Sequence, residues 1–427
     1  MNETPSVTYR FLYLSTKTHP KVIRLRVRMR DPIAPDALTA AVETTMRRFP
    51  YYAVALRRDG DRFLFEPNDR PVRVLRASDA FALNAPETNG HLIAFSWADD
   101  RIVLDVFHGL TDGTGAYEIM RTLLYYYCSL RYGRTLPPEG VRLLGDPIPD
   151  EEWADPVLKL PDLPAPAPKT LSDALSLVHA AGLEQDRVPT VYSVAIPEAE
   201  FMRFTAAHDG SPGTMTALFL SRAVAGLYPD RQQVIRVSLC VNQRPALGAP
   251  AAHGCHVGAA MLEYKDRLRD WPLDRQATAF RGMVFAQTLE ERVLDGVAAQ
   301  TALAKRFIAA KTDDERLALA RAVSENTARV QTATVSYVGR ANYRDAERYI
   351  RDFRTWTIAE TPMLVEISAV NGRFVLDFIQ HFSSPVYLNA FLAELEGCGV
   401  SFDLQDAQPL SLPAVRLPWS GSDGGKI

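Results

Sequence analysis

The chain has 427 residues, of which 47% are apolar and 23% charged, and a formal net charge of −3. This length predicts two or three domains, and the composition is typical of a soluble globular protein. Basic residues are scattered along the chain instead of gathered in one segment, which argues against nucleic-acid binding.

Residues 22–30, "VIRLRVRMR", alternate apolar side chains with arginine and therefore predict a strand. We interpret the arginine side as a solvated sheet face, the alternative being contact with an anionic partner or a cofactor phosphate. The next predicted elements are a helix at 34–50, a hairpin at 53–67 turning at Asp59-Gly60, a hairpin at 91–109 turning at Asp99-Asp100, and a helix at 112–131.

Between Pro147 and Pro168 there are seven prolines in 22 residues, a density that regular elements do not tolerate. We take this segment as the start of a crossover between two subdomains. The predicted boundaries are 1–146, 147–190 for the crossover, and 191–427. The elements predicted after it are strands at 191–197, 234–242 and 332–339, helices at 213–229 and 384–396, two or three helices within 274–330, and a hairpin at 363–381 turning at Asn371-Gly372.

Neither half shows the regular strand–helix alternation of a doubly wound parallel sheet. Hairpins mixed with helices predict an α/β protein with two layers of mixed sheet in place of that fold.

The first residues, the apolar stretches and the cysteines indicate in which cellular compartment the protein is expected. The first residues, "MNETPSV", lack the basic and apolar regions of a secretion signal, and no stretch has the roughly 18–20 apolar residues that span a bilayer. The four cysteines, Cys128, Cys240, Cys255 and Cys398, form no C-x-x-C pair, which is typical of a reduced compartment. We expect a cytoplasmic protein with no membrane span.

Several common site motifs do not occur in the chain. It has no G-x-S-x-G elbow, no G-x-G-x-x-G after a strand and no G-x-x-x-x-G-K-[ST] phosphate loop. His253, Cys255 and His256 in "HGCHVG" are candidate metal ligands, but a further ligand at suitable spacing is not evident, so we expect a loop after the 234–242 strand and no metal site.

The stretch "LDVFHGLTDGTG" at 104–115 ends an apolar strand on His108 and places Asp112 and Gly113 at the start of a helix. Taken singly, His108 reads as a histidine at a strand end, and Asp112 as a helix N-cap. Together they form an H-x-x-x-D-G motif between a strand and a helix. In this context the chain resembles the CoA-dependent acyltransferase superfamily, which includes chloramphenicol acetyltransferase, alcohol acetyltransferases and condensation domains.

Other segments extend this resemblance over most of the chain. "RRFP" at 47–50, "VNQRP" at 241–245 and "VSYVGR" at 335–340 are similar to segments of the alcohol acetyltransferase and condensation branches. Two positions depart from the pattern. Phe107 stands where many relatives have a second histidine, which argues against a condensation domain, and Tyr337 stands where relatives often carry asparagine.

The resemblance implies two chloramphenicol acetyltransferase-like subdomains of mixed sheet, with an active-site tunnel between them. His108 would be the general base, because an imidazole with a pKa near 6.5 can take a proton from an attacking hydroxyl at neutral pH. Asp112 would pair with an arginine, Arg244 first and Arg10 second, and so hold the His108 loop. Gly113 would keep the approach to His108 open, and Ser336 is the candidate donor to the oxyanion.

The function that follows is transfer of an acyl group from acyl-CoA to a hydroxyl acceptor by a monomer. Acyl-CoA would be a co-substrate, and no permanently bound cofactor is expected. One alternative is an acyltransferase or condensation enzyme that takes its donor from an acyl carrier protein and forms an ester or an amide. The other is a non-catalytic protein that binds acyl-CoA or a partner.

Overall fold

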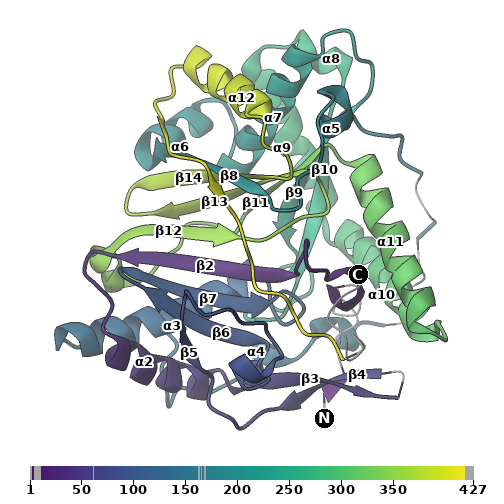
Figure 1. Ribbon diagram of the computed structural model, residues 1–427. Helices are drawn as coiled ribbons and strands as arrows, with labels where there is room; N and C mark the ends of the chain where they lie inside the picture. Colours follow the sequence, from purple (N-terminus) through teal and green to yellow (C-terminus); the bar gives the residue numbers. More distant parts are fainter. Residues whose placement is uncertain are drawn as a thin grey trace.

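Two β-sheets lie one above the other, and each carries helices on its outer face (Figure 1). The structure, a computed structural model, describes residues 2–3, 11–60, 62–161, 164, 166–167 and 170–418. Within these ranges, no helix is both long enough and apolar enough to cross a bilayer.

The first sheet has the strand order β12-β2-β7-β6-β5. Its strands are β2 (Val22–Met29), β5 (Val74–Arg76), β6 (Ile93–Ala98), β7 (Arg101–Phe107) and β12 (Ile350–Trp356). Its outer face is covered by α2 (Pro35–Arg48) and α3 (Gly113–Tyr132). A small separate sheet joins β1 (Asn2–Glu3), β3 (Val54–Asp59) and β4 (Arg62–Pro67).

The second sheet has eight strands in the order β10-β9-β11-β13-β14-β8-β15, with β16 also paired to β8. They are β8 (Thr190–Pro197), β9 (Ile235–Asn242), β10 (Val257–Tyr264), β11 (Ala333–Tyr337), β13 (Met363–Val370), β14 (Arg373–Gln380), β15 (Asp403–Leu404) and β16 (Gln408–Pro409). The helices on its outer face include α6 (Glu198–Ala207), α7 (Pro212–Leu227), α9 (Leu273–Thr288) and α12 (Val386–Gly397).

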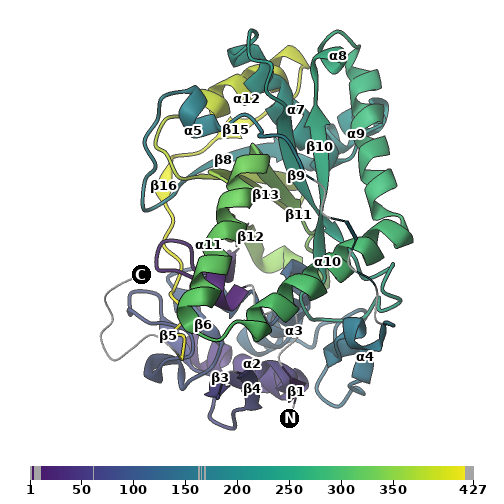
Figure 2. The ribbon, with the colours of Figure 1, turned by 90° about the vertical axis from the view of Figure 1, so that its right-hand side faces the viewer.

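The remaining elements are short turns or lie beside the two sheets. They are α4 (Asp150–Trp153), α5 (Leu177–Ala180), α8 (Asp266–Arg269), α10 (Glu290–Ala309), α11 (Asp313–Val330), and the 3₁₀ turns η1 (Pro50–Tyr52), η2 (Pro86–Thr88), η3 (Pro156–Lys159) and η4 (Arg344–Tyr349). Figure 2 shows α10 and α11 reaching from the second half to the first. There the Tyr13 ring stacks on Phe307 at 5.6 Å, and Arg58 pairs with Asp313.

Each sheet packs a core against its own helices. Ile23, Leu25 and Val27 of β2 lie on the face that meets α2 and α3, because alternate residues of a strand point to one side. The core of the second half lies between its sheet and α7, α9 and α12. These contacts leave the inner faces of the two sheets turned toward each other.

The strand β12 belongs in sequence to the second half, yet it pairs antiparallel with β2 at the edge of the first sheet. It therefore lies between the two halves (Figure 1). Because β12 of the second half completes the sheet of the first half, no single cut in the chain separates the two halves. The predicted domain boundaries stay a prediction.

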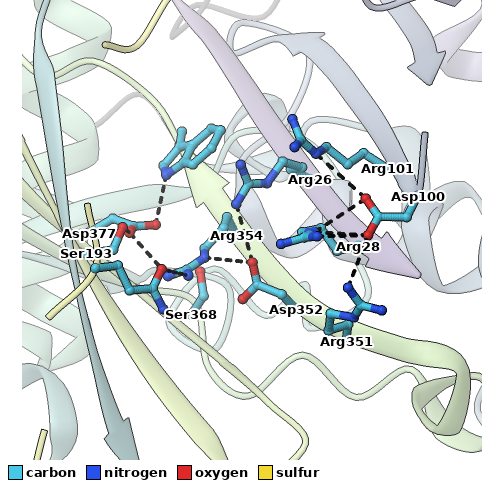
Figure 3. A network of polar contacts seen from close by, with 12 residues as sticks. Arg26, Arg28, Asp100, Arg101, Ser193, Arg351, Asp352, Arg354, Ser368 and Asp377 are labelled. Carbon is cyan, nitrogen blue, oxygen red and sulfur yellow. Dashed lines mark hydrogen bonds and ion pairs between the residues drawn. The ribbon is translucent and has the colours of Figure 1, made fainter. Parts of the chain in front are cut away.

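The arginine face of β2 is partly buried and ion-paired instead of fully solvated, which corrects the interpretation of residues 22–30. Arg24 donates two hydrogen bonds to the buried Asp105, Arg26 pairs with Asp352, and Arg28 pairs with Asp100. Figure 3 shows the pairs of Arg26 and Arg28 as part of a polar network that runs along β2 and β12 toward the second sheet. β12 of the other half lies beside this charged face and supplies Asp352, whereas Asp100 and Asp105 belong to the first half.

Candidate active site

The H-x-x-x-D-G motif lies in the turn between β7 and α3. His108 comes directly after β7, and its main-chain N–H donates to the Lys21 carbonyl at 2.8 Å. Asp112 is the N-cap of α3 and accepts a hydrogen bond from the Thr114 N–H at 3.0 Å. The apolar strand thus delivers His108 to the sheet end, and the N-cap starts the next helix four residues later.

The structure brings Asp112 together with Arg244, which follows β9 in the second half. The guanidinium donates to both carboxylate oxygens, each at 2.9 Å, and both side chains are buried. A bidentate pair of this kind fixes direction as well as distance. The second candidate partner, Arg10, lies outside the described residues.

The "HGCHVG" segment is bonded to the same turn. The His256 N–H donates to Asp112 Oδ2 at 2.9 Å, and Arg244 donates to the Gly254 carbonyl at 2.7 Å. Thr111 Oγ1 donates to the His253 carbonyl at 2.6 Å. These bonds link the loop after β9 to the His108 turn, so the two halves are joined at this point.

The His108 imidazole is held on two sides. Its Nδ1 lies 3.6 Å from Cys255 Sγ, and its ring stacks on Phe11 with 4.6 Å between the centroids. Cys255 is buried. The sequence motif gives no indication of this thiol, because Cys255 is 147 residues away in the chain.

His253 and His256 are buried imidazoles. Burial lowers the pKa of His253 to about 3 and that of His256 to about 4, so both are neutral at pH 7. The Nδ1 of His253 contacts the Tyr51 hydroxyl at 2.6 Å. In the described part of the chain, no three His, Cys, Asp or Glu side chains gather in a way that could hold a metal ion.

A cavity of about 430 Å³ opens beside His108 and is lined by both halves. His108, Asp112 and Gly113 come from the first half, and Arg244, Ser336 and Tyr337 from the second. All five predicted site residues therefore line one cavity. Whether it continues as a tunnel open on two sides stays a prediction.

Gly113 lies directly against the segment that follows β11. A Cβ on Gly113 would lie 2.4 Å from Val338 Cγ2, which is closer than real Cβ contacts. Val338 also lines the cavity. The glycine thus permits the close approach of α3 to the second half beside His108.

Three charged residues of the cavity wall, Glu366, Lys21 and Glu360, were not predicted as functional. Glu366 of β13 is buried and lies in register beside Ser336 of β11. Lys21 pairs with Glu360, and both line the cavity. A signal for Glu366 was present, since it is the one charged residue in the apolar strand "MLVEISAV".

The "RRFP" segment has a structural partner in the crossover. Arg48 donates to both oxygens of Glu152 at 2.9 Å, and both side chains are buried. The Glu152 carbonyl also accepts from the His253 N–H at 2.9 Å. This pair fastens the proline-rich segment to the first half, close to the "HGCHVG" loop.

Comparison with known proteins finds similarity in structure and not in sequence. No protein-family model matches the chain, and no curated protein matches it in sequence. Polyketide synthase associated protein 5 from Mycobacterium tuberculosis superposes with a TM-score of 0.60 at 14% identity, covering 92% of this chain and 96% of that one.

Two further structures show the range of similar proteins. TRI101 of F. graminearum, complexed with coenzyme A and deoxynivalenol, gives a TM-score of 0.59 at 12% identity, with 92% of this chain and 98% of that one covered. The starter condensation domain of rhizomide synthetase RzmA gives 0.54 at 15% identity, with 93% and 96% covered. The chain has the chloramphenicol acetyltransferase-like fold.

In this chloramphenicol acetyltransferase-like fold, the predicted motif residues lie where the two halves meet. The H-x-x-x-D-G turn belongs to the first half, and Arg244 and Ser336 belong to the second. The fold expected from the resemblance is therefore confirmed. The chemical roles of the residues are not decided by the fold.

Proposed function

We propose that the protein is an acyltransferase that moves an acyl group from acyl-CoA to a hydroxyl acceptor, with His108 as general base. The observation that carries this proposal is the position of His108 on a cavity shared by both halves, on a turn fixed by the Asp112–Arg244 pair. Similarity to a protein complexed with coenzyme A supports the choice of donor.

The reaction would proceed without a covalent enzyme intermediate. His108 takes the proton of the acceptor hydroxyl as its oxygen attacks the thioester carbonyl carbon, and a tetrahedral oxyanion forms. Collapse of this intermediate breaks the carbon–sulfur bond, and the CoA thiolate takes the proton from the imidazolium. The products are the ester and free CoA, and the imidazole returns to its neutral form.

The remaining residues hold the His108 turn in place or stabilise the oxyanion. Asp112, Gly113 and Arg244 keep the His108 turn in place and its approach open. Ser336 is the proposed donor to the oxyanion, since its side chain lines the cavity together with His108. Acyl-CoA is a co-substrate in this scheme, and the protein acts as a cytoplasmic monomer with both halves of the site in one chain.

A second candidate keeps the chemistry and changes the donor. Similarity to condensation domains, among them that of rhizomide synthetase, favours a donor carried by an acyl carrier protein and an ester or amide product. A non-catalytic protein that binds acyl-CoA is the third candidate.

The test is the release of CoA thiol from acetyl-CoA and longer acyl-CoAs, with a panel of alcohols and amines and with water alone. Wild type is compared with His108→Ala and with His179→Ala, a matched change at an exposed histidine. Release that needs both an acceptor and His108 supports the proposal.

Other outcomes separate the candidates. Equal release by wild type and His108→Ala removes His108 from the mechanism. If only an acylated carrier protein serves as donor, the second candidate replaces the first. Binding of acyl-CoA with no turnover from either donor leaves the third.

A further inference from the structure

Glu366 is a buried carboxyl group in the wall of the cavity that holds His108. It lies in the middle of β13, its residue is only 2% exposed, and it lines the cavity. A carboxylate removed from water needs a counter-charge or several hydrogen bonds, so its surroundings decide its form.

The register of four strands places Glu366 in a polar row. Each residue of this row is the direct partner of the next across neighbouring strands. The row consists of Ser336 of β11, Glu366 of β13, Asp377 of β14 and Ser193 of β8. Directly opposite residues share one face of a sheet, so all four side chains point to the face that turns toward β12 and the first sheet. Two carboxyl groups therefore stand side by side on this face.

The two carboxyl groups have different partners. Asp377 accepts hydrogen bonds from Arg354, from the Trp356 indole N–H and from the Ser193 hydroxyl. Figure 3 shows Arg354 and Ser193 converging on Asp377. Glu366 shares a hydrogen bond with Ser336, while among the described residues its Oε2 has no partner.

Glu366 is held in its neutral form by these surroundings. Its pKa is raised to about 8, chiefly by burial; the Ser336 hydrogen bond lowers the pKa and the neighbouring Asp377 raises it. The titratable or charged groups that face it are Asp377 on β14, Arg354 on β12, Tyr117 on α3 and, across the cavity, His108. Arg354 is engaged by Asp352 and Asp377.

The other charges on the cavity wall are already paired. Asp112 pairs with Arg244, and Lys21 pairs with Glu360. A charged substrate group would therefore enter without a counter-charge, which is costly in a buried site. An uncharged molecule with a hydroxyl group meets no such cost, and it can pair with a carboxylic acid that both donates and accepts.

We propose that Glu366 is the specificity-determining residue of the acceptor subsite, a neutral carboxylic acid that hydrogen-bonds a second oxygen function of an uncharged acceptor. This inference rests on the proposed function. An alkyl acyl chain has no polar group besides its thioester, so it has no second group that Glu366 could bind. We therefore assign the subsite to the acceptor. The substrate class is a neutral polyhydroxylated or hydroxy-carbonyl compound, acylated at one oxygen and recognised at another.

The kinetic arm compares hexane-1,2-diol with hexan-1-ol, using acetyl-CoA as donor. Glu366→Leu removes both hydrogen-bonding functions, and Glu366→Gln keeps a neutral donor and acceptor of similar shape. We expect Glu366→Leu to lower the diol-to-mono-ol ratio of kcat/KM about tenfold. We expect Glu366→Gln to keep it within about threefold of wild type. An unchanged ratio in Glu366→Leu overturns the proposal.

The second arm does not need turnover. The infrared carbonyl band of a protonated carboxyl group is measured in wild type minus Glu366→Gln. We expect the band at neutral pH, its loss with a midpoint at a pH of about 8, and a shift on adding hexane-1,2-diol but not hexan-1-ol. A carboxylate already ionised at about pH 6, or a band that ignores the diol, overturns the subsite.

The two arms also separate this inference from the proposed function. Failure of acyl transfer with an intact diol-dependent band shift would overturn the donor or the chemistry and keep the subsite. Turnover without discrimination between the two alcohols would keep the chemistry and overturn the subsite. A preference for amines that disappears in Glu366→Gln would show that an ionised Glu366 pairs with an ammonium group, which contradicts the neutral acid.

Discussion

Cys255 Sγ lies 3.6 Å from Nδ1 of His108, although the two residues belong to different halves of the protein. The thiol is held there because its loop is bonded to Asp112 through the His256 N–H and to Arg244 through the Gly254 carbonyl. The Asp112–Arg244 ion pair therefore holds both the His108 turn and the thiol that lies beside Nδ1 of His108. We therefore expect Cys255 to act as a positioning residue for the imidazole.

The first prediction concerns this thiol. We expect Cys255→Ala to lower kcat about fivefold, as for the loss of one modest hydrogen bond, with an unchanged KM for acyl-CoA. Cys255→Ser, which keeps a polar atom, should recover part of the loss. The measurement is the pH profile of kcat for both variants, with Cys398→Ala as a control away from the cavity. Kinetics and a pH profile equal to wild type in Cys255→Ala would contradict the positioning role.

The second prediction concerns the pair of Asp112 and Arg244. Each single change to alanine leaves a buried charge without its partner, so each should lower the free energy of unfolding by about 3–5 kcal/mol and reduce activity. The double variant should lose clearly less than the sum of the two, because the partner is removed as well. Urea unfolding of the four proteins measures this coupling.

A surface pair provides the control for that cycle. Arg281 and Asp209 form an exposed ion pair, and Arg281→Ala should cost only about 0–1 kcal/mol. If Asp112→Ala and Arg244→Ala melt like wild type, the pair does not stabilise the turn between β7 and α3.

The third prediction concerns the close approach of α3 to the end of β11. Gly113→Ala would place a methyl group 2.4 Å from Val338 Cγ2, so one of the two segments must shift. We expect a stability loss of about 1–3 kcal/mol, as for other overpacked contacts, together with reduced activity. Val338→Ala removes the clashing methyl group and should rescue Gly113→Ala. Activity and melting temperature of the single and double variants check this, and a double variant as impaired as Gly113→Ala would show that the clash is not the cause.

The fourth prediction is a pH dependence of stability from Glu366. Its pKa is about 8 in the folded protein and near 4.5, the ordinary value, in the unfolded chain. Because the unfolded state loses its proton first, the stability contribution is fully present below about pH 4.5 and is lost as the pH rises to about 8. The slope is at most about 1.4 kcal/mol per pH unit.

The comparison that isolates this effect is wild type against Glu366→Gln, which cannot ionise. Their difference in free energy of unfolding should change between about pH 5 and about pH 8, to the disadvantage of wild type at the higher pH. Glu396→Gln, at an exposed carboxyl group, serves as control. A constant difference across this range would mean that Glu366 is ionised in the folded protein.

Local sequence signals were sufficient to predict much of the first sheet and the hairpin of the second sheet. Asn371 and Gly372 both have positive φ, as the type I′ turn between β13 and β14 requires, and Asp99 and Gly60 turn the two earlier hairpins with positive φ. The strand–turn–helix around His108 was predictable because an apolar run and an N-cap are both local.

Other parts depend on contacts between the halves and could not be predicted. β10 carries glycine and alanine where strands usually carry branched side chains, and β12 carries three charged residues, so neither has a clear strand signal. The arginine face of β2 alternates like a solvated face, and only the acids on neighbouring strands and on β12 show that it is covered. The motif and the similar segments predicted five residues that line one cavity, His108, Asp112, Gly113, Arg244 and Ser336, and their roles stay a prediction. Cys255 and Glu366 reach the cavity through contacts between segments that are distant in sequence.

Because β12 is an edge strand of the first sheet, that sheet is completed only late in synthesis of the chain. During synthesis, β2 emerges long before its partner at the sheet edge, β12, which ends only at Trp356. For most of the time on the ribosome, β2 is therefore an open edge that could pair with another nascent chain. Arg24 and Arg28 find their acids, Asp105 and Asp100, within the first half, whereas Arg26 meets Asp352 only when β12 arrives. In that interval Arg26 is a charge on an open edge, which discourages such pairing. The side chain that joins the two halves at the end would thus protect the unfinished first half before the second exists.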